Sequence, residues 1–349
     1  MGLSDSALRR HLRAAFGEKG DAYVSADAHA GTTTRSRWQL NGHGGPADLP
    51  SSVFVKSPAQ DMASRIMGVA FGLGRREVIF YRQLSAEVPV RVPKMYAAHL
   101  GRRPGTFSLV IEDLAEGTEF PNLVDGCSDD VATAVIDAQA KFHGRYWGSD
   151  RFAGDLESLA IGHWLKRMWL RDLLLKASLK KCFELHPGVV PAEQQNAAKD
   201  FLKRTKVLDR HTQGQAPFTL IHGDCHAGNL FVQGPTVGFL DWQLARQANG
   251  LYDMSYFMFS SMPIDRRRAL EADLIERYRR GLSEAGVEAP TTEEANAMHA
   301  LNALHVWMSA VVTGGMANLQ TMDATRGALE RAVAAVDDHD SFARLAALS

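Results

Sequence analysis

The sequence predicts an α+β fold in two parts: a small antiparallel sheet in the N-terminal third and a larger, mainly helical C-terminal part. Up to about Asp113, short apolar runs bounded by turn residues dominate, and such runs are more typical of strands than of helices. From Ser128 onward apolar residues recur mostly at helical spacing, interrupted by one strand-rich stretch at Phe218–Trp242. We therefore expect one domain at residues 1–113 and a second at residues 114–349.

The composition is that of an ordinary globular protein. Of 349 residues, 45% are hydrophobic and 23% charged, and the net charge of −1 gives no case for nucleic-acid binding. The three cysteines, Cys127, Cys182 and Cys225, lie far apart, which fits a reducing cytoplasm better than a disulfide framework or a zinc site. The first residues, MGLSDSALRRHL, lack the apolar run of a signal peptide, and polar residues interrupt the apolar segments near the C-terminus. We expect a cytoplasmic protein without a membrane span; the oligomeric state stays open.

The first predicted elements are a short helix, a turn that contains glycine and threonine, and an exposed loop. Apolar spacing predicts a short amphipathic helix at Leu8–Phe16. The stretch Ala30–Leu40 begins with a turn at Gly31, Thr32 and Thr33, whose hydroxyl and main-chain amide groups could contact phosphate. The turn-rich segment 41–51 is expected to be an exposed loop.

A strand at 53–56 ends in Lys56, and residues 75–84 are expected to form the next helix. Glu77 lies beside the apolar stripe of that helix, so its carboxylate is the first candidate to hold the Lys56 ammonium. Glu87 and Asp61 are weaker candidates, because Val88-Pro89 ends the helix at Glu87 and Asp61 only precedes the helix. The segments 92–96 and 107–114 are expected to be the last strands of the sheet.

The stretch Phe218–Trp242 carries the strongest motif. Three short apolar runs predict strands at 218–221, 230–233 and 237–240. The loop after the first run contains Asp224 and, five residues later, Asn229, while Asp241 ends the third run. One carboxylate to meet an acceptor hydroxyl, with an amide oxygen and a second carboxylate to hold Mg2+ on ATP, suits phosphoryl transfer.

The pattern His-Gly-Asp-x-His-x-x-Asn, followed by a strand and Asp-Trp, resembles the small-molecule phosphotransferases of protein-kinase-like fold. That group includes aminoglycoside phosphotransferases, choline kinases and ecdysteroid-kinase-like proteins, and Asp-Trp-Gln at 241–243 is most similar to the last. The resemblance implies a two-lobe kinase-like fold and a kinase that uses ATP and Mg2+. It covers most of the chain, but the motifs are dense only at 56–84 and 222–253.

The resemblance also implies roles for individual residues. Asp224 would be the catalytic base, and Asn229 and Asp241 would bind the metal. His222 and Asp253 would support the catalytic loop. The implied nucleotide-binding residues are the pair Lys56 and Glu77, the phosphate-covering Gly31, Thr32 and Thr33, and, through main-chain bonds to adenine, Glu112, Asp113 and Leu114. ATP and GTP are not distinguished.

Helical signals fill the C-terminal part. The predicted helices span about 128–144, 156–185 and 188–210, another runs from Asp265 to Gly281, and the last begins at Thr291 with Glu294 as a capping box and ends at Gly314-Gly315. His143 is expected to be structural rather than a ligand. The Met and aromatic residues after Asp253 are expected to be core, with an apolar acceptor pocket as the alternative.

The charge of the segment 151–216 bears on the acceptor. It holds twelve Lys/Arg and seven Asp/Glu, and in the resembling enzymes this region lies on the acceptor side. A polycationic aminoglycoside would need an acidic wall, so a neutral or anionic alcohol, sterol-like or hydroxyacyl, is favoured over an aminoglycoside or choline-type acceptor. A protein kinase is disfavoured because about eleven residues separate Asp241 from Asp253, which leaves little platform for a peptide. A catalytically silent nucleotide-binding module is the remaining alternative.

Overall fold

The computed structural model describes most of the chain. The described residues are Arg13, Phe16, 22–29 as backbone alone, 33–40, 50–114, 117–316 and 320–348. The predicted helix at 8–16, except for Arg13 and Phe16, lies outside them, as do Gly31, Thr32 and nearly all of the loop at 41–51.

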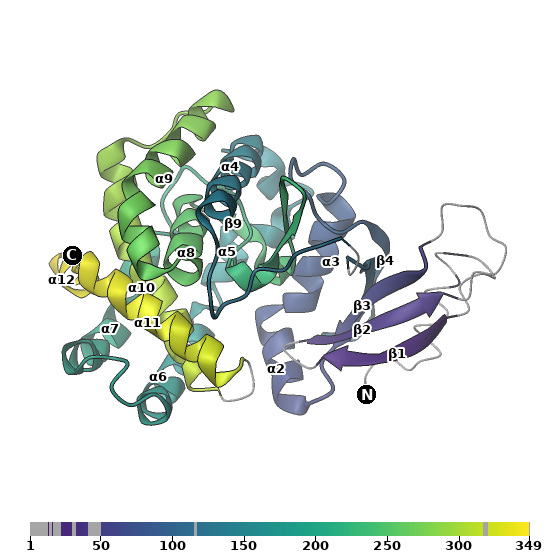
Figure 1. The fold of residues 1–349 in the computed structure, drawn as a ribbon, viewed down its shortest axis with the longest axis horizontal. Helices are drawn as coiled ribbons and strands as arrows, with labels where there is room; N and C mark the ends of the chain where they lie inside the picture. The colour runs from purple at the N-terminus through teal and green to yellow at the C-terminus, as the bar shows by residue number, and fades with distance from the viewer. Residues whose placement is uncertain are drawn as a thin grey trace. The chain divides into compact units, whose positions relative to one another are not determined.

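The chain divides into two compact units. Unit 1 contains residues 1–118 together with the short segment Leu240–Leu244, and unit 2 contains Glu119–Phe239 and Ala245–Ser349. The described part of unit 1 is built on a sheet, and that of unit 2 is mainly helical (Figure 1). This arrangement confirms the predicted α+β class.

Unit 1 contains a five-stranded antiparallel sheet in the order β1-β2-β3-β5-β4. Its strands are β1 (Ala22–His29), β2 (Thr33–Leu40), β3 (Ser52–Pro58), β4 (Met95–Leu100) and β5 (Phe107–Glu112). Trp38, Val53, Val55 and Val110 form a buried cluster on the sheet, because alternate residues of paired strands share a face. Strand β3 lies between β2 and β5, and it presents Lys56 opposite Arg35 on one side and Leu109 on the other.

Two helices follow β3. Helix α2 (Met62–Phe71) is capped by the Asp61 side chain, which accepts a hydrogen bond from the Ser64 amide. Gly72, at φ 69°, ends α2 in the left-handed region that glycine favours, and α3 (Leu73–Gln83) begins immediately after it. Helix α3 packs against β4 and β5. The sequence predicted this helix within two residues at its start and one at its end.

Unit 2 has short strands embedded among helices. Strand β6 (Thr219–Ile221) pairs with β9 (Arg246–Ala248), while β7 (Leu230–Gln233) and β8 (Thr236–Phe239) form a hairpin. The helices are α4 (Asp129–Arg145), α5 (Ile161–Leu165), α6 (Met168–Leu185), α7 (Ala192–His211), α8 (Leu251–Ser261), α9 (Ile264–Glu284), α10 (Thr292–Gly314), α11 (Met322–Asp338) and α12 (Ser341–Ala347). In Figure 1, α11 and α12, drawn in yellow, lie beside α10.

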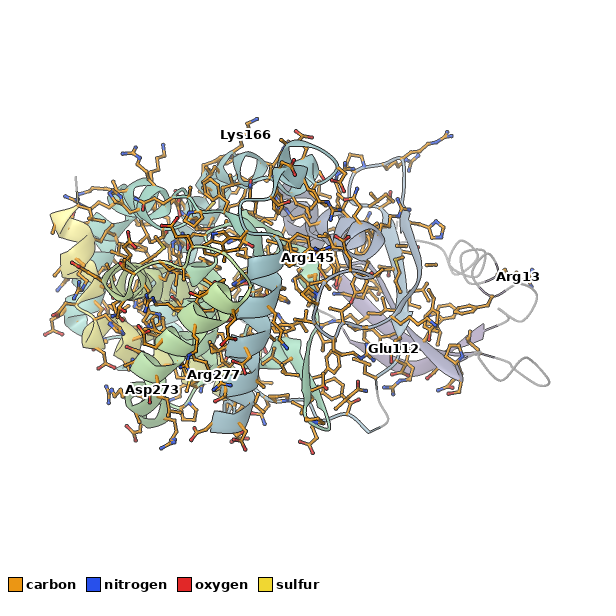
Figure 2. The ribbon with its side chains drawn as sticks, turned by 90° about the horizontal axis from the view of Figure 1, so that it is seen from above. Arg13, Glu112, Arg145, Lys166, Asp273 and Arg277 are labelled. Carbon is orange, nitrogen blue, oxygen red and sulfur yellow. The ribbon has the colours of Figure 1, made fainter. Side chains whose placement is uncertain are left out.

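Two helix predictions were wrong in their boundaries. The predicted helix at 156–185 is broken into a 3-10 turn (η3, Glu157–Leu159), α5 and α6. On α5, the centroid of the buried Trp164 ring lies 4.3 Å from the guanidinium carbon of Arg246. Helix α9 continues through Gly281, where a Cβ would lie 2.6 Å from the Cβ of Ala140 on α4. The glycine therefore permits close packing instead of ending the helix. An ion pair between Arg277 of α9 and Asp137 of α4 joins the same two helices, and Arg277 is labelled in Figure 2.

The core of unit 2 centres on α8 and α10. All eleven residues of α8 are buried, including the polar Asp253, Ser255, Ser260 and Ser261, so this helix has no solvent-facing side. Helix α10 begins with the predicted capping box of Thr291 and Glu294 and ends at Gly314. Of the later methionines, Met308 is buried in the core as predicted, whereas Met322, the first residue of α11, is 54% exposed and lies outside it. None of the helices in the described ranges combines the length and low charge that a membrane crossing requires. All three cysteines are buried free thiols.

Candidate active site

In unit 1 the centre of the site is a buried lysine between two carboxylates. Lys56 Nζ donates to Oε1 of Glu77 at 2.6 Å and to Oδ1 of Asp241 at 2.9 Å. Glu77 is the partner that the sequence favoured, whereas Asp61 caps α2 and Glu87 is exposed beyond α3. The second partner, Asp241, comes from the segment Leu240–Leu244 that belongs to unit 1.

Aromatic stacking fixes this segment on α3. The Trp242 ring stacks on Phe80 with centroids 3.9 Å apart and planes 6° apart, and Phe80 lies one turn after Glu77. Asp241 itself has φ 57°, a left-handed conformation that aspartate adopts more readily than bulky residues do. The stacking and the ion pair to Lys56 hold Asp241 in that conformation.

Burial and charge act on the pKa values of this triad in opposite directions. Burial raises the pKa of Glu77 to about 7, and the negative charge of Asp241 adds to that effect, although Lys56 opposes it. Burial alone would lower the pKa of Lys56, but Asp241 and Glu77 raise it above its ordinary value. Lys56 is therefore charged at neutral pH, as a lysine that contacts phosphate must be.

The remaining nucleotide candidates among the described residues of unit 1 lie at the start of β2, at the end of β5 or directly after β5. Thr33 is the first residue of β2 and is buried. Asp113 accepts two hydrogen bonds from Arg37 and one from Ser52, while the Glu112 carboxylate pairs with Arg91. The Glu112 amide donates to the Lys94 carbonyl oxygen, so a main-chain bond to adenine here would involve its carbonyl or the groups of Asp113 and Leu114.

In unit 2 the side chain of Asp224 is oriented by two neighbours. Tyr256 donates its hydroxyl proton to Oδ1 at 3.0 Å, and the Asn229 amide nitrogen donates to the Asp224 main-chain oxygen at 2.9 Å and to Oδ2 at 3.3 Å. Because Asn229 uses its nitrogen in this way, its Oδ1 is directed elsewhere and is available as an acceptor. His226 Nε2 lies 3.8 Å from the Asp224 carboxylate.

The loop that carries Asp224 is anchored by Asp253. Asp253 accepts from the His222 amide at 2.5 Å and from the Gly223 amide at 2.8 Å, and Gly223 adopts φ 84°. The imidazole of His222 accepts from the Asp224 amide at 3.2 Å, so it buttresses the loop from inside. Asp253 is fully buried, and burial alone would raise the pKa of its carboxyl. The hydrogen bond from His143 and the bond from the Gly223 amide outweigh burial and hold this pKa below its ordinary value.

A second layer of contacts fixes Asp253. His143 Nε2 lies 3.4 Å from Oδ2 of Asp253, and His143 Nδ1 lies 2.7 Å from the Tyr278 hydroxyl. Since the carboxylate accepts from Nε2–H, Nδ1 accepts from the tyrosine O–H in the neutral ring. Burial lowers the pKa of His143, which favours this neutral form. His143 is thus a structural histidine, as the sequence led us to expect.

Tyr256 is the residue of this site that the sequence interpretation missed, because it was grouped with the apolar stripe of α8. The sequence feature that could have identified Tyr256 is its position three residues after Asp253. Residues three apart share a helix face, so a polar group one turn beyond the loop anchor can reach the same loop. Tyr256 also lies 2.9 Å from the Ser309 hydroxyl and stacks near Tyr252, with centroids 5.8 Å apart.

The donor groups fit Mg2+ and a nucleotide. Carboxylate and amide oxygens are the ligands that Mg2+ prefers, and Asp241 and Asn229 offer one of each. A charged, buried lysine with fixed carboxylate partners fits a phosphate group. A separate cavity of about 440 Å³ in unit 2, lined by Trp147, Pro217, Asn249, Leu251, Glu288 and Met298 among others, contains none of the predicted site residues.

Comparison with known proteins gives a family and a fold. Residues 52–313 match the family described as the phosphotransferase enzyme family. No curated protein matches the sequence. Among solved structures, a Ralstonia eutropha JMP134 protein assigned to the aminoglycoside phosphotransferases is 16% identical with a TM-score of 0.56, covering 96% of each chain.

Two further structures agree. A choline/ethanolamine kinase family protein from Mesorhizobium loti is 13% identical with a TM-score of 0.51, covering 98% of this chain and 97% of its own. A microcompartment-associated aminopropanol kinase is 12% identical with a TM-score of 0.52, covering 99% of both chains. These likenesses confirm the predicted kinase-like fold.

Proposed function

Because the chain belongs to the phosphotransferase enzyme family, and so transfers phosphate to alcohol groups of small molecules, we propose that Asp224 is its catalytic base. The observation that carries this assignment is the anchoring of the Asp224 loop. Asp253 holds the loop amides while Tyr256 and Asn229 orient the carboxylate. A carboxylate fixed in this way can accept the proton of an incoming hydroxyl without reorganising first.

We propose ATP as the nucleotide, in keeping with the kinases of the family, and we assign its phosphate contacts to Lys56. The pairing of Lys56 with Glu77 supports this role, because a lysine already held by a buried carboxylate loses little side-chain entropy when phosphate binds. Gly31 and Thr32, together with Thr33 at the start of β2, would cover the phosphates. Main-chain groups of Glu112, Asp113 and Leu114 would meet the adenine.

We assign Mg2+ to Asn229 and Asp241. The β7–β8 hairpin supports this pairing, because Leu230 is opposite Phe239. Asn229 directly precedes the first of these residues and Asp241 follows the second by two positions, so the chain itself limits their separation. When bound, the metal neutralises charge on the phosphates. Unit 1 would then bind nucleotide, and unit 2 would supply the base and the acceptor site.

For the acceptor we propose a neutral or anionic alcohol. The side chains linked to Asp224 support this. Tyr256 stacks near Tyr252, and the Arg246 guanidinium lies 4.9 Å from the Tyr252 ring. Burial lowers the pKa of His305 on α10, and the charges of Arg171 and Arg246 add to that effect; Arg171 is itself paired with Asp172 and Asp209. Aromatic and cationic groups suit an apolar or acidic alcohol better than a polycation.

A panel of acceptors tests the assignment. The protein is incubated with Mg-ATP and choline, ethanolamine, an aminoglycoside, a hydroxyacyl compound or a sterol-like alcohol, and products are identified by mass spectrometry. Phosphorylation of the hydroxyacyl or sterol-like alcohol is expected, at a kcat/KM at least tenfold above that for the cationic acceptors. A preference for the aminoglycoside or choline would overturn the acceptor class while leaving the kinase assignment intact.

A further inference from the structure

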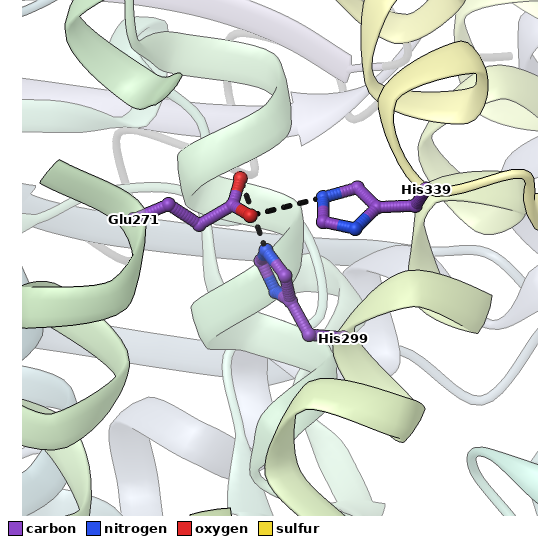
Figure 3. Close-up of side chains that lie close together, drawn as sticks. All are labelled: Glu271, His299 and His339. Atoms are coloured by element: carbon purple, nitrogen blue, oxygen red, sulfur yellow. Dashed lines mark ion pairs between the residues drawn. The ribbon is translucent and has the colours of Figure 1, made fainter. Parts of the chain in front are cut away.

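Three side chains from separate parts of unit 2 converge at a place outside the candidate active site. Glu271 on α9, His299 on α10 and His339 just after α11 each offer one ligand atom, and these atoms lie within 4.8 Å of one another. Figure 3 shows both imidazoles directed at the Glu271 carboxylate. His299 Nε2 lies 3.6 Å from Oε2, and His339 Nε2 lies 3.0 Å from Oε1.

The hydrogen bonds of Ser255 fix the orientation of His299. The Ser255 hydroxyl donates its only proton to the Leu251 carbonyl oxygen at 2.7 Å. His299 Nδ1 lies 2.8 Å from the same hydroxyl oxygen, so Nδ1 must carry the hydrogen and donate it. In the neutral ring Nε2 therefore presents its lone pair, and it presents it to a carboxylate. Histidine ligands of metals are held in this way, with the second ring nitrogen donating to an oxygen.

The Nε2 atoms are also buried without a suitable partner. Within the described ranges of the chain, neither Nε2 makes a hydrogen bond of good geometry, although each lies close to Glu271. The side chain of His299 is 1% exposed, and those of Glu271 and His339 are 16% and 18% exposed. The cluster is thus enclosed on the His299 side and lies near the surface at Glu271 and His339.

We propose that Glu271, His299 and His339 form a binding site for one zinc-class divalent metal ion. Two imidazole nitrogens and one carboxylate oxygen are a common zinc ligand set, with a water molecule as the fourth ligand. Ligands at tetrahedral positions around zinc are about 3.3 Å apart. His339 Nε2 lies 3.0 Å from Oε1 of Glu271, close to that value, and all three ligand atoms lie within 4.8 Å of one another. A hard, octahedral ion such as Mg2+ suits the two imidazoles poorly.

Arg267 is compatible with this site. Its Nη1 donates to Oε2 of Glu271 at 2.6 Å, and its other amino group binds Asp338. The hydrogen bond orients the carboxylate and leaves Oε1, the oxygen nearest to His339, for the ion. The metal would tie α9, α10 and the end of α11 together. It would also stabilise α8, which carries Ser255. The active-site residues Asp253 and Tyr256 lie two positions before and one position after Ser255 on that helix.

The site is tested on the full chain, stripped with a chelator and free of nucleotide. Titration with Zn2+ should give one bound ion per chain, and Co2+ should give the intense visible absorption of a four-coordinate site. His339→Gln should lower zinc affinity at least 100-fold, because it removes one of three protein ligands. The side chain of His339 is partly exposed after α11, so the variant is expected to fold, and circular dichroism checks this.

Two matched variants separate this site from general histidine binding. His163 lies 3.0 Å from Glu157 in an exposed pair, so His163→Gln should leave zinc binding unchanged. Ser255→Ala should weaken zinc binding 10- to 100-fold, since it removes the group that orients His299. Absence of stoichiometric zinc binding, or equal zinc affinity in wild type and His339→Gln, would overturn the proposal. Those results would show that the cluster is an ion-pair network without a metal. No outcome depends on kinase activity.

Discussion

Lys56 and Asp241 lie 185 residues apart in the sequence, yet Lys56 Nζ lies 2.9 Å from Oδ1 of Asp241 within unit 1. The contact exists because the chain returns to unit 1 for only five residues, Leu240–Leu244. The stacking of Trp242 on Phe80 holds the segment Leu240–Leu244 against α3. A proposed metal ligand and a proposed phosphate contact are therefore fixed to each other before nucleotide binds.

Lys56→Met should remove the ammonium that contacts the phosphates. We expect phosphoryl transfer to fall at least 100-fold, since loss of one preorganised charge at a reacting group typically costs this much. Steady-state kinetics with Mg-ATP measures the effect. Lys180→Met is the control, because Lys180 is 88% exposed. Activity of Lys56→Met within threefold of wild type would refute the role of Lys56.

Asp241→Asn should weaken nucleotide binding in a metal-dependent way. Calorimetric titration with a non-hydrolysable ATP analogue is expected to show at least tenfold weaker binding in the presence of Mg2+, with a much smaller change in chelator. Asp200→Asn, at an exposed position, should match wild type. An equal loss with and without Mg2+ would mean that Asp241 acts only by positioning Lys56.

Glu77 should make stability depend on pH. Its ordinary pKa is 4.5 and burial raises it to about 7 in the folded protein, so between these values the folded state binds the extra proton. Stability therefore falls as pH rises through this window, by up to about 1.4 kcal/mol per pH unit from this group. Urea unfolding of wild type and Glu77→Gln from pH 5 to 7.5 should show the smaller slope in the variant. Exposed Glu87→Gln should keep the wild-type slope, and parallel curves for wild type and Glu77→Gln would count against the assignment.

Asp253→Asn should destabilise unit 2. The carboxylate is fully buried and accepts bonds from the His222 and Gly223 amides, so its replacement is expected to cost about 2 to 3 kcal/mol in the free energy of unfolding. Urea unfolding measures this cost, and Asp273→Asn at an exposed position of α9 is the control. A change below about 0.5 kcal/mol would show that Asp253 does not anchor the loop.

Much of the architecture was accessible from local patterns. The helix carrying Glu77, the capping box at Thr291 and the hairpin after Asn229 all depend on residues close in sequence, whereas the sheet also needs the distant pairing of β3 with β5. Gly281 misled the prediction because a glycine inside a helix and one ending a helix look alike until the contact with Ala140 is known. The pairing of β6 with β9 likewise depends on a distant partner.

The site was partly accessible for the same reason. The Lys56–Glu77 pair follows from strand-then-helix order, but the contact between Lys56 and Asp241 needs the return of the chain to unit 1. The expectation of no zinc site considered cysteines, whereas Glu271, His299 and His339 are 28 and 40 residues apart and carry no local motif. The roles of the active-site residues stay predictions.

The central claim is that Asp224 is the base for transfer of the γ-phosphate to a small alcohol. The most direct measurement incubates a metabolite extract with γ-labelled ATP, Mg2+ and wild type, Asp224→Asn or Tyr256→Phe, and separates labelled small molecules. Wild type should label an alcohol, Tyr256→Phe should label it about tenfold more slowly because it loses one hydrogen bond to Asp224, and Asp224→Asn should label it at least 1,000-fold more slowly. Labelling by Asp224→Asn at the wild-type rate, or no labelled small molecule with wild type, would contradict the account.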